Sequence, residues 1–225
     1  MQAQSQSQSQ SQPPPTAEPL APSNAQAATL VKIPGLKYKE VNLNGSSFSM
    51  ALMRQLSFFN TIKLGCLMGM GYRTQAISVL ATNVMAPRGL IGLGYDSLAH
   101  SKGEIKEVFT TLADEEAYPI LVHCTQGKDR TGLVVLLLCM LCGVDTAAMG
   151  ADYMATQAGL KGERAEKLEE VRSIGLPDSF ADCDPEWVEK VMEHITTQYG
   201  GIQAYLRGCG VTDAMMERIT RKMLR

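Results

Sequence analysis

The chain has 225 residues, of which 45% are hydrophobic and 20% charged, a composition typical of a globular protein with room for one domain and a tail. Its 21 basic and 23 acidic residues give a net charge of −2, which gives no support to binding of nucleic acid or an anionic membrane through bulk charge. The longest apolar run, residues 133–142, is too short to span a bilayer, so we expect no transmembrane segment.

The N-terminal stretch differs from the rest of the chain. Residues 1–28 are rich in Gln, Ser and Pro, and Glu18 is their only charge. Such a stretch cannot bury enough apolar surface to offset its ordering entropy, so we predict a disordered tail over 1–28 and a folded domain over 30–225. It has no apolar segment and no Lys or Arg before Lys32, which argues against a secretory signal or transit peptide. We therefore expect a cytoplasmic protein with reduced cysteines.

The folded part is predicted to contain several helices and one clear strand. Short extended pieces flank a turn at Pro34-Gly35, and a short apolar run over residues 120–123 is typical of a strand. The predicted helices run from Ser46, Ser47 or Ser49 through Phe59, over Tyr72–Val84, over Lys102–Leu112, over 131–142, and from caps at Asp145, Asp184 and Thr212.

The segment between the predicted strand and the apolar helix 131–142 is the most informative. It reads Cys124-Thr125-Gln126-Gly127-Lys128-Asp129-Arg130 and is followed by Thr131. A loop between a strand end and a helix N-terminus can point successive backbone N–H groups inward, which makes an anion site. Gly127 permits a backbone conformation that a side chain would oppose. The composition predicts only about 0.003 chance matches to this pattern of Cys, Gly, Arg and Ser/Thr.

Cys124 and Arg130 in such a loop point to chemistry on a phosphate group. The Arg130 guanidinium can hold two phosphate oxygens in a bidentate fork. The same positive field lowers the pKa of Cys124 and supplies thiolate at neutral pH. Nucleophile and phosphate site then coincide, which is the requirement for in-line attack of sulfur on phosphorus.

The motif from His123 to Gly132, His-Cys-x-x-Gly-Lys-Asp-Arg-Thr-Gly, resembles the signature of the cysteine-dependent protein tyrosine phosphatase superfamily. It is most similar to the atypical tyrosine/serine protein phosphatase family of bacteria and fungi. The resemblance extends from about Ile33 to the C-terminus through weaker features such as Asp152-Tyr153. It implies a tyrosine phosphatase-like catalytic domain over 30–225. The implied fold is a three-layer α/β fold, with a small, mainly parallel sheet flanked by helices.

The resemblance also implies a role for each residue of the loop. Cys124 would be the nucleophile and form a phosphocysteine intermediate. Thr131 would hydrogen-bond the sulfur and make it a better leaving group, and His123 would brace the loop. No metal or other cofactor is expected. The residues expected to bind the substrate phosphate are Thr125, Gln126, Gly127, Lys128, Asp129 and Arg130, with Lys128 adding positive charge at the pocket mouth.

The general acid requires a separate argument. Many tyrosine phosphatases take it from a mobile Trp-Pro-Asp loop, but the only Trp here is Trp187, which is followed by Val188. Asp129 is the natural alternative, because it could protonate the leaving oxygen and then activate water. Asp96 and the acidic cluster 114–116 are the other candidates.

The function expected from these residues is dephosphorylation of phosphotyrosine, with phosphoserine and phosphothreonine as further substrates to consider. Lys128 leaves phosphoinositide or inositol phosphate substrates open. The chain lacks the Asn-Phe-Arg-Asp-like segment and the strand ending in Asp-Leu-Arg with which family members usually begin. This leaves open a sheet without the usual N-terminal strands, and a pseudophosphatase that binds phosphate without turnover. The expected partner is a phosphorylated protein or a phosphoinositide, and not a nucleic acid.

Overall fold

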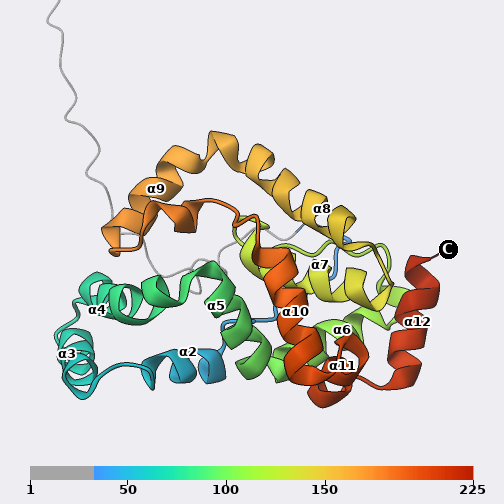
Figure 1. Ribbon diagram of the computed structural model, residues 1–225, viewed down its shortest axis with the longest axis horizontal. Coiled ribbons are helices and arrows are strands. Elements are labelled where there is room, and N and C mark those ends of the chain that lie inside the picture. Colours follow the sequence, from blue (N-terminus) through green and yellow to red (C-terminus); the bar gives the residue numbers. More distant parts are fainter. Residues whose placement is uncertain (1–32, 225) are drawn as a thin grey trace, which may run out of the picture. The chain divides into compact units, whose positions relative to one another are not determined.

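The computed structural model describes residues 33–224, and these residues form helices joined by turns and loops (Figure 1). The chain divides into two units, residues 1–40 and 41–225. The tail predicted over residues 1–28 lies outside the described part. The predicted turn at Pro34-Gly35 is present, since Gly35 has a φ of 86° and the Leu36 N–H donates to the Ile33 carbonyl at 3.3 Å.

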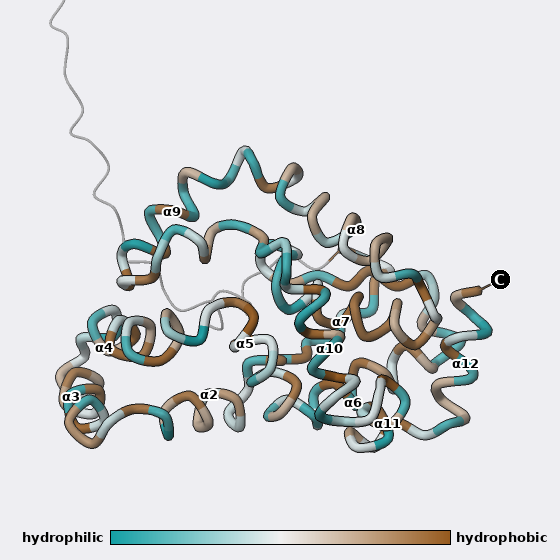
Figure 2. The backbone as a smooth tube through the Cα atoms, in the orientation of Figure 1, coloured by the Kyte–Doolittle hydropathy of each residue, from teal (hydrophilic) through white to brown (hydrophobic). Residues whose placement is uncertain are grey.

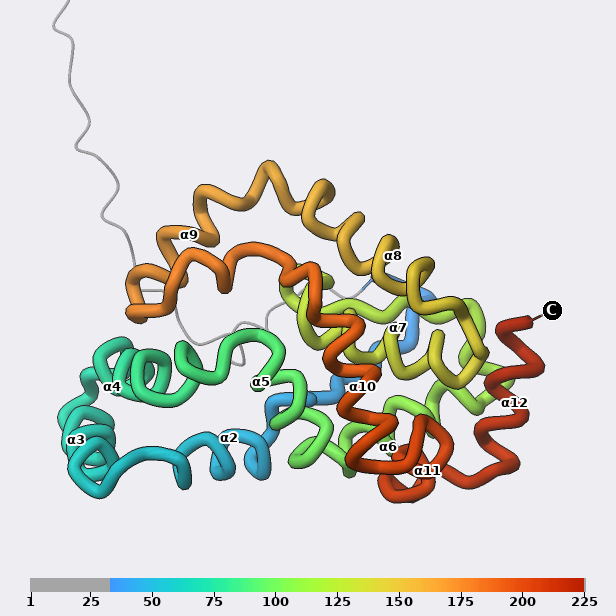
Figure 3. Tube along the Cα trace, viewed as in Figure 1, coloured from blue at the N-terminus to red at the C-terminus, as the bar shows by residue number. Residues whose placement is uncertain are grey.

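The second unit can be followed from blue to red in Figure 3. Its first elements are α2 (Ser46–Met53), α3 (Phe58–Gly69), α4 (Arg73–Leu80), the π-helical turn η2 (Ala81–Met85) and α5 (Ala86–His100). Next come α6 (Lys102–Leu112), η3 (Glu115–Ala117), α7 (Asp129–Leu141), α8 (Thr146–Gly159), η4 (Leu160–Gly162), α9 (Arg164–Ser173) and η5 (Asp178–Ala181). The last helices are α10 (Trp187–Tyr199), α11 (Ile202–Cys209) and α12 (Asp213–Met223).

Several helix boundaries follow from local signals in the sequence. Asp145 caps α8 by accepting a hydrogen bond from the Ala147 N–H at 2.9 Å. Thr212 caps α12 in the same way, through the Met215 N–H at 3.3 Å. Helix α6 spans the predicted range Lys102–Leu112. These boundaries could be predicted because each depends on residues within one helical turn.

Two predicted helices are interrupted in the structure. The helix predicted from the serines at 46–49 through Phe59 is two helices, because the Ser57 hydroxyl accepts from the Asn60 N–H and begins α3. The helix predicted over 72–84 continues through η2 into α5. Its kink comes at Gly89, whose φ of 62° is non-helical.

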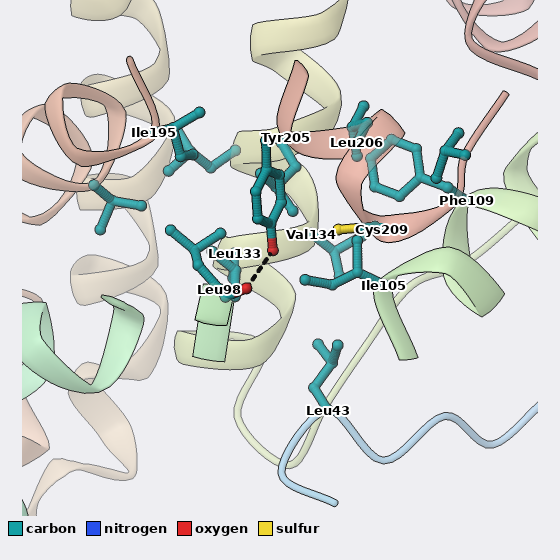
Figure 4. Close-up of a cluster of buried hydrophobic side chains, with 14 of the residues drawn as sticks. Leu43, Leu98, Ile105, Phe109, Leu133, Val134, Ile195, Tyr205, Leu206 and Cys209 are labelled. Atoms are coloured by element: carbon teal, nitrogen blue, oxygen red, sulfur yellow. Dashed lines mark hydrogen bonds between the residues drawn. The ribbon is translucent and has the colours of Figure 1, made fainter. Parts of the chain in front are cut away.

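The largest hydrophobic cluster holds together α6, α7, α10 and α11 (Figure 4). Phe109 and Leu206 are completely buried in it, and the Tyr205 hydroxyl donates to the Leu98 carbonyl at 2.9 Å. Burial of each large apolar side chain contributes about 1.5–3 kcal/mol. This cluster therefore fixes α7, the helix that follows the loop at 124–128.

The predicted α/β fold is wrong for the described residues. Helices make up 72% of this part of the chain, and residues 33–224 contain no strand or sheet. Residues 120–123, predicted as a strand, have no regular structure. Ile120 and Val122 pack against the core while Leu121 between them is 85% exposed, which is the alternation of a strand. A strand also needs a neighbour to complete its hydrogen-bond ladder, and none is present in the described part.

The helical run Arg73–His100 is, by length and composition, long and apolar enough to cross a membrane. It is interrupted at Gly89, and Arg88 within it forms an ion pair with Asp96 at 2.6 Å. Val79 and Leu98 of this run are buried in the protein's own hydrophobic clusters. The run thus contributes buried side chains to two clusters of this fold, while 28% of its most apolar stretch is buried.

Candidate active site

The loop at 124–128 leads directly into the first turn of α7. Gly127 has a φ of 71°, in the left-handed region, and an added Cβ there would meet no atom within 4 Å. The Gly132 N–H donates to the Lys128 carbonyl at 2.9 Å, which closes the first turn of the helix. The free N–H groups of this turn and the helix dipole therefore place partial positive charge beside the loop.

Cys124 is half-buried in this loop, and its surroundings favour the thiolate. Burial by itself would raise the pKa of Cys124. The Thr131 hydroxyl and the backbone N–H groups of Thr131, Gln126 and Gly127 outweigh burial and lower the pKa. The Thr131 Oγ1 is buried and meets no partner at full hydrogen-bond geometry among residues 33–224, so it acts on the thiol as a nearby donor dipole.

Arg130, in the first turn of α7, reaches back to the start of the loop. Its Nη2 donates to the Thr125 Oγ1 at 3.0 Å, which joins the two ends of the loop. His123 is exposed, and its Nδ1 lies 3.2 Å from the Cys124 carbonyl oxygen. Cys124, Thr125, Arg130 and Thr131 are thus brought together as the sequence predicted.

Asp129 occupies the first turn of α7. Its Oδ1 lies 3.6 Å from the Lys128 Nζ, and its side chain is 56% exposed. The protein atoms crowded around Asp129 raise the pKa of its carboxyl, against the opposing effect of Lys128, Lys167 and Arg130. A raised pKa favours a proton donor, which is the role predicted for Asp129.

The alternative acids have other roles in the structure. Asp96 is buried on α5 and accepts two hydrogen bonds from Arg88, at 2.8 and 2.6 Å. Asp114 accepts from the Glu116 N–H at 3.1 Å and so caps η3. Each of these carboxylates stabilises its own segment, which leaves Asp129 as the candidate beside Cys124.

The side chain of Lys128 does not lie where it was expected. It is 1% exposed, and its Nζ donates to the backbone carbonyls of Phe180 at 2.9 Å and Asp182 at 2.8 Å. The ammonium group therefore lies inside the protein, where it joins the loop to η5, and not at the mouth of a pocket. Sequence reasoning missed this because the partners are 52 and 54 residues away.

Asp182 extends this connection to α8 and α9. Its carboxylate accepts two hydrogen bonds from Arg164, at 2.7 and 2.8 Å, and one from the Gln157 Nε2 at 2.7 Å. The hydrogen bonds from Arg164, followed by the one from Gln157, lower the pKa of Asp182 to about 2. The active-site loop is thus tied through Lys128 to three elements that follow it in the chain.

Tyr153 forms the wall behind the loop. Its ring stacks on Trp187, with centroids 4.9 Å apart, and lies so close to Gly132 that an added Cβ would be 3.3 Å away. Burial raises the pKa of its hydroxyl, which has no hydrogen-bond partner in the described part of the chain. Tyr153, Gly127 and Thr131 help to line a cavity of about 120 Å³ beneath the loop, whose lining does not include Cys124 or Arg130. The resemblance at Asp152-Tyr153 was the only sequence signal for this wall.

Comparison with known proteins identifies the family of the chain. The family described as "Tyrosine phosphatase family" matches residues 68–225, which include the whole loop and α7. The chain belongs to the tyrosine phosphatase family. The resemblance predicted from the motif at 123–132 is therefore confirmed.

Two curated relatives illustrate the extent of the similarity. The chain is 28% identical over 163 residues to a tyrosine-protein phosphatase of Nostoc commune, which covers 64% of this chain and 55% of that protein. It is 28% identical over 135 residues to the triple specificity protein phosphatase PtpB of Mycobacterium tuberculosis, which covers 53% of this chain and 48% of that protein. The matches thus span about half the length of these relatives.

Proposed function

We propose that this protein is a cysteine-dependent phosphomonoester hydrolase that dephosphorylates phosphotyrosine through a phosphocysteine intermediate. The observation that carries the proposal is the arrangement at the start of α7. There, a thiol with a lowered pKa, an arginine and a hydrogen-bonding threonine belong to one loop around a helix N-terminus.

In the first half of the reaction, the Cys124 thiolate attacks phosphorus and forms the S–P bond as the P–O bond to the tyrosyl oxygen breaks. Asp129 gives its proton to the leaving oxygen, so tyrosine departs neutral. Arg130 and the N–H groups at the start of α7 hold the equatorial oxygens, where negative charge develops. Arg130 is already held at the rim of the loop by Thr125.

In the second half, water attacks the phosphocysteine and the S–P bond breaks. Asp129, now a carboxylate, takes a proton from this water, and inorganic phosphate leaves. Thr131 donates a hydrogen bond to the departing sulfur and so stabilises the thiolate that is regenerated. The enzyme returns to its starting state with no cofactor in the cycle.

The names of the relatives support phosphotyrosine as the first substrate to test. One is named a tyrosine-protein phosphatase, and the other, PtpB, is named a triple specificity protein phosphatase. We therefore propose phosphotyrosine as the main substrate and phosphoserine or phosphothreonine as secondary ones. The Lys128 ammonium is buried, so it does not stand at a pocket mouth where it could contact a lipid headgroup.

We also propose that the enzyme works in the cytoplasm. All six cysteines are free, and the proposed nucleophile must remain a thiol to act. A reducing compartment maintains that state.

Phosphate release from para-nitrophenyl phosphate, without metal and with reductant, tests the proposal. The wild type should turn over, and Cys124→Ser should lower kcat at least about a thousandfold, because serine is a far weaker nucleophile. Arg130→Lys should lose about a hundredfold, because a lysine cannot form the bidentate fork. Cys66→Ser, at an exposed cysteine on α3, is the matched control and should keep the wild-type rate.

Two outcomes would contradict the proposal. A folded wild type that binds phosphate without turnover would be a pseudophosphatase. Turnover that survives in Cys124→Ser would show that another group performs the chemistry.

A further inference from the structure

Helix α3 presents an apolar face to solvent. Phe58 is 75% exposed, Phe59 81% and Ile62 49%. Phe58 and Ile62 are four residues apart and share one side of the helix, and the exposed Cys66 continues that side. The two phenyl rings lie edge to face, 5.9 Å apart. We call Phe58, Phe59, Ile62 and Cys66 the outer face of α3.

The outer face has no packing role among the described residues. Leu64 and Leu67, on the opposite side of α3, pack against the cluster that contains Leu52 and Val79 of α2 and α4. The Asn60 amide donates to Asn83 at 2.9 Å and adds a polar tie on that inner side. These inner-side contacts hold α3 in place. The large apolar side chains on the outer face are not needed for that packing, and an exposed apolar patch of this kind marks an interaction site. Figure 2 shows the hydrophobic colouring along α2 and α3.

The elements that share the hydrophobic cluster beneath α3, namely α2, α4 and η2, carry no acidic residue. Residues 41–95 contain no Asp or Glu and four basic residues, which are Arg54, Lys63, Arg73 and Arg88. Arg88 is neutralised by Asp96, which leaves three cations of this segment unpaired within the described part of the chain, one of which, Lys63, lies on α3 itself. The net charge of −2 for the whole chain hides this local excess.

A polar hollow lies beside the outer face. Its volume is about 490 Å³, and its lining includes Lys63, Ser78 and Asn83 but no carboxylate. Lys63 follows Phe59 by four residues and precedes Leu67, which also lines the hollow. Lys63 thus stands between an apolar face and a hollow of hydroxyl and amide groups.

We propose that α3 docks its outer face on an anionic lipid surface. Phe58, Phe59 and Ile62 would enter the boundary between headgroups and acyl chains, as the apolar face of an interfacial helix does. Arg54, Lys63 and Arg73 would meet the lipid anions at headgroup level, and the polar hollow would accept headgroups.

The charge distribution favours lipid over a second copy of the chain. A two-fold symmetric dimer through this face would bring the acid-free, cationic segments 41–95 of two copies together, and like charges would repel. An anionic bilayer supplies both the apolar phase and the opposite charge. The inference does not depend on the proposed phosphatase activity, because α3 contains no residue of the loop 124–131.

Flotation of the full chain with vesicles tests the proposal, with phosphatidylcholine alone compared with equal parts of phosphatidylcholine and phosphatidylserine. The wild type should float with the anionic vesicles, and added salt should weaken the association. Replacing both rings, Phe58→Ser with Phe59→Ser, should weaken binding at least about tenfold, because their apolar area no longer leaves water. Lys63→Gln should weaken it about fivefold.

Matched substitutions elsewhere serve as controls. Leu224→Ser removes an exposed apolar side chain after α12, and Arg218→Gln removes an exposed cation. Both should float like the wild type. The double phenylalanine variant should keep the wild-type thermal unfolding and aryl phosphatase rate, since its rings are exposed and distant in sequence from the loop.

Three results would overturn the proposal. One is an absence of flotation by the folded wild type. Another is equal flotation by the wild type and the double phenylalanine variant. The third is a wild type that sediments as a dimer and a double variant that sediments as a monomer, with no preference for anionic vesicles. That result would assign the face to a second copy of the chain.

Discussion

At the scale of the residue, the Thr131 hydroxyl is one of the donors that lower the pKa of Cys124. The lowered pKa of Cys124 means that thiolate persists at a pH below the ordinary thiol range and disappears only on further acidification. Thr131→Ala removes one stabilising donor and should move the pKa of Cys124 upward. Cys124 alkylation by iodoacetamide should then fall at neutral pH and recover at alkaline pH.

The same substitution should lower kcat about tenfold or more, because a hydrogen bond to the departing thiolate is lost. Thr131→Ser keeps the hydroxyl and is the control, with an alkylation profile close to that of the wild type. An unchanged pH profile in Thr131→Ala would show that the backbone N–H groups alone set the pKa of Cys124.

Lys128 leads to a prediction about stability. Lys128→Met removes the donor to two buried carbonyls, those of Phe180 and Asp182, and should cost about 3 kcal/mol in the free energy of unfolding. Urea denaturation measures this cost. Lys190→Met removes an exposed lysine that pairs with Glu193 at 3.5 Å, and should change the free energy by about 0.5 kcal/mol or less. Equal stability of the two variants would contradict the buried role of Lys128.

The contrast between these residues shows what sequence reasoning can reach. Cys124, Arg130 and Thr131 could be proposed together because they lie within eight residues, at the loop and the start of the helix that follows it. The loop pattern placed Lys128 in the chain but could not show where its side chain points. The carbonyls that accept from its ammonium belong to Phe180 and Asp182, at and just after η5. Tyr153 was missed as a wall of the site for the same reason, since α8 places it there.

At the scale of the element, Asp182 connects η5 with α8 and α9 and should make that connection sensitive to acid. Its folded-state pKa of about 2 lies below the unfolded value of about 3.9. The resulting stabilisation is fully present above about pH 4 and is lost as the pH falls towards about 2.

Asp182→Asn should therefore lower the free energy of unfolding by about 1–2 kcal/mol at neutral pH, with solvent screening included. The difference from the wild type should shrink as the pH falls from about 4 to about 2. Asp213→Asn, which breaks an exposed pair with Arg207, is the control and should cost about 0.5 kcal/mol or less. A difference between Asp182→Asn and the wild type that is independent of pH would contradict this account.

The elements also divide into those that local sequence predicts and those that it does not. The caps at Asp145 and Thr212 and the periodicity of α6 are local, and these helices were predicted. A strand is not local, because its backbone groups must pair with another segment. Residues 120–123 show the alternation of a strand, and residues 33–224 give them no strand to pair with.

At the scale of the whole molecule, the structure predicts a protein dominated by helix. The far-ultraviolet circular dichroism spectrum of the purified chain should show the double minimum of α-helix and little contribution from β-structure. The expected spectrum follows from a described part that is 72% helical. A spectrum with a substantial β component would contradict the all-helical arrangement.

The central claim is that Cys124 carries the phosphoryl group, and trapping of that intermediate tests it most directly. The chain would be mixed with a phosphotyrosine peptide, quenched rapidly in acid, and its peptides analysed by mass spectrometry. With para-nitrophenyl phosphate, whose leaving group departs without help from an acid, Asp129→Asn should accumulate the intermediate, because the water that hydrolyses it loses its base. We predict one phosphate on Cys124, absent from Cys124→Ser. Turnover of the peptide with phosphate on another residue, or on none, would contradict the claim.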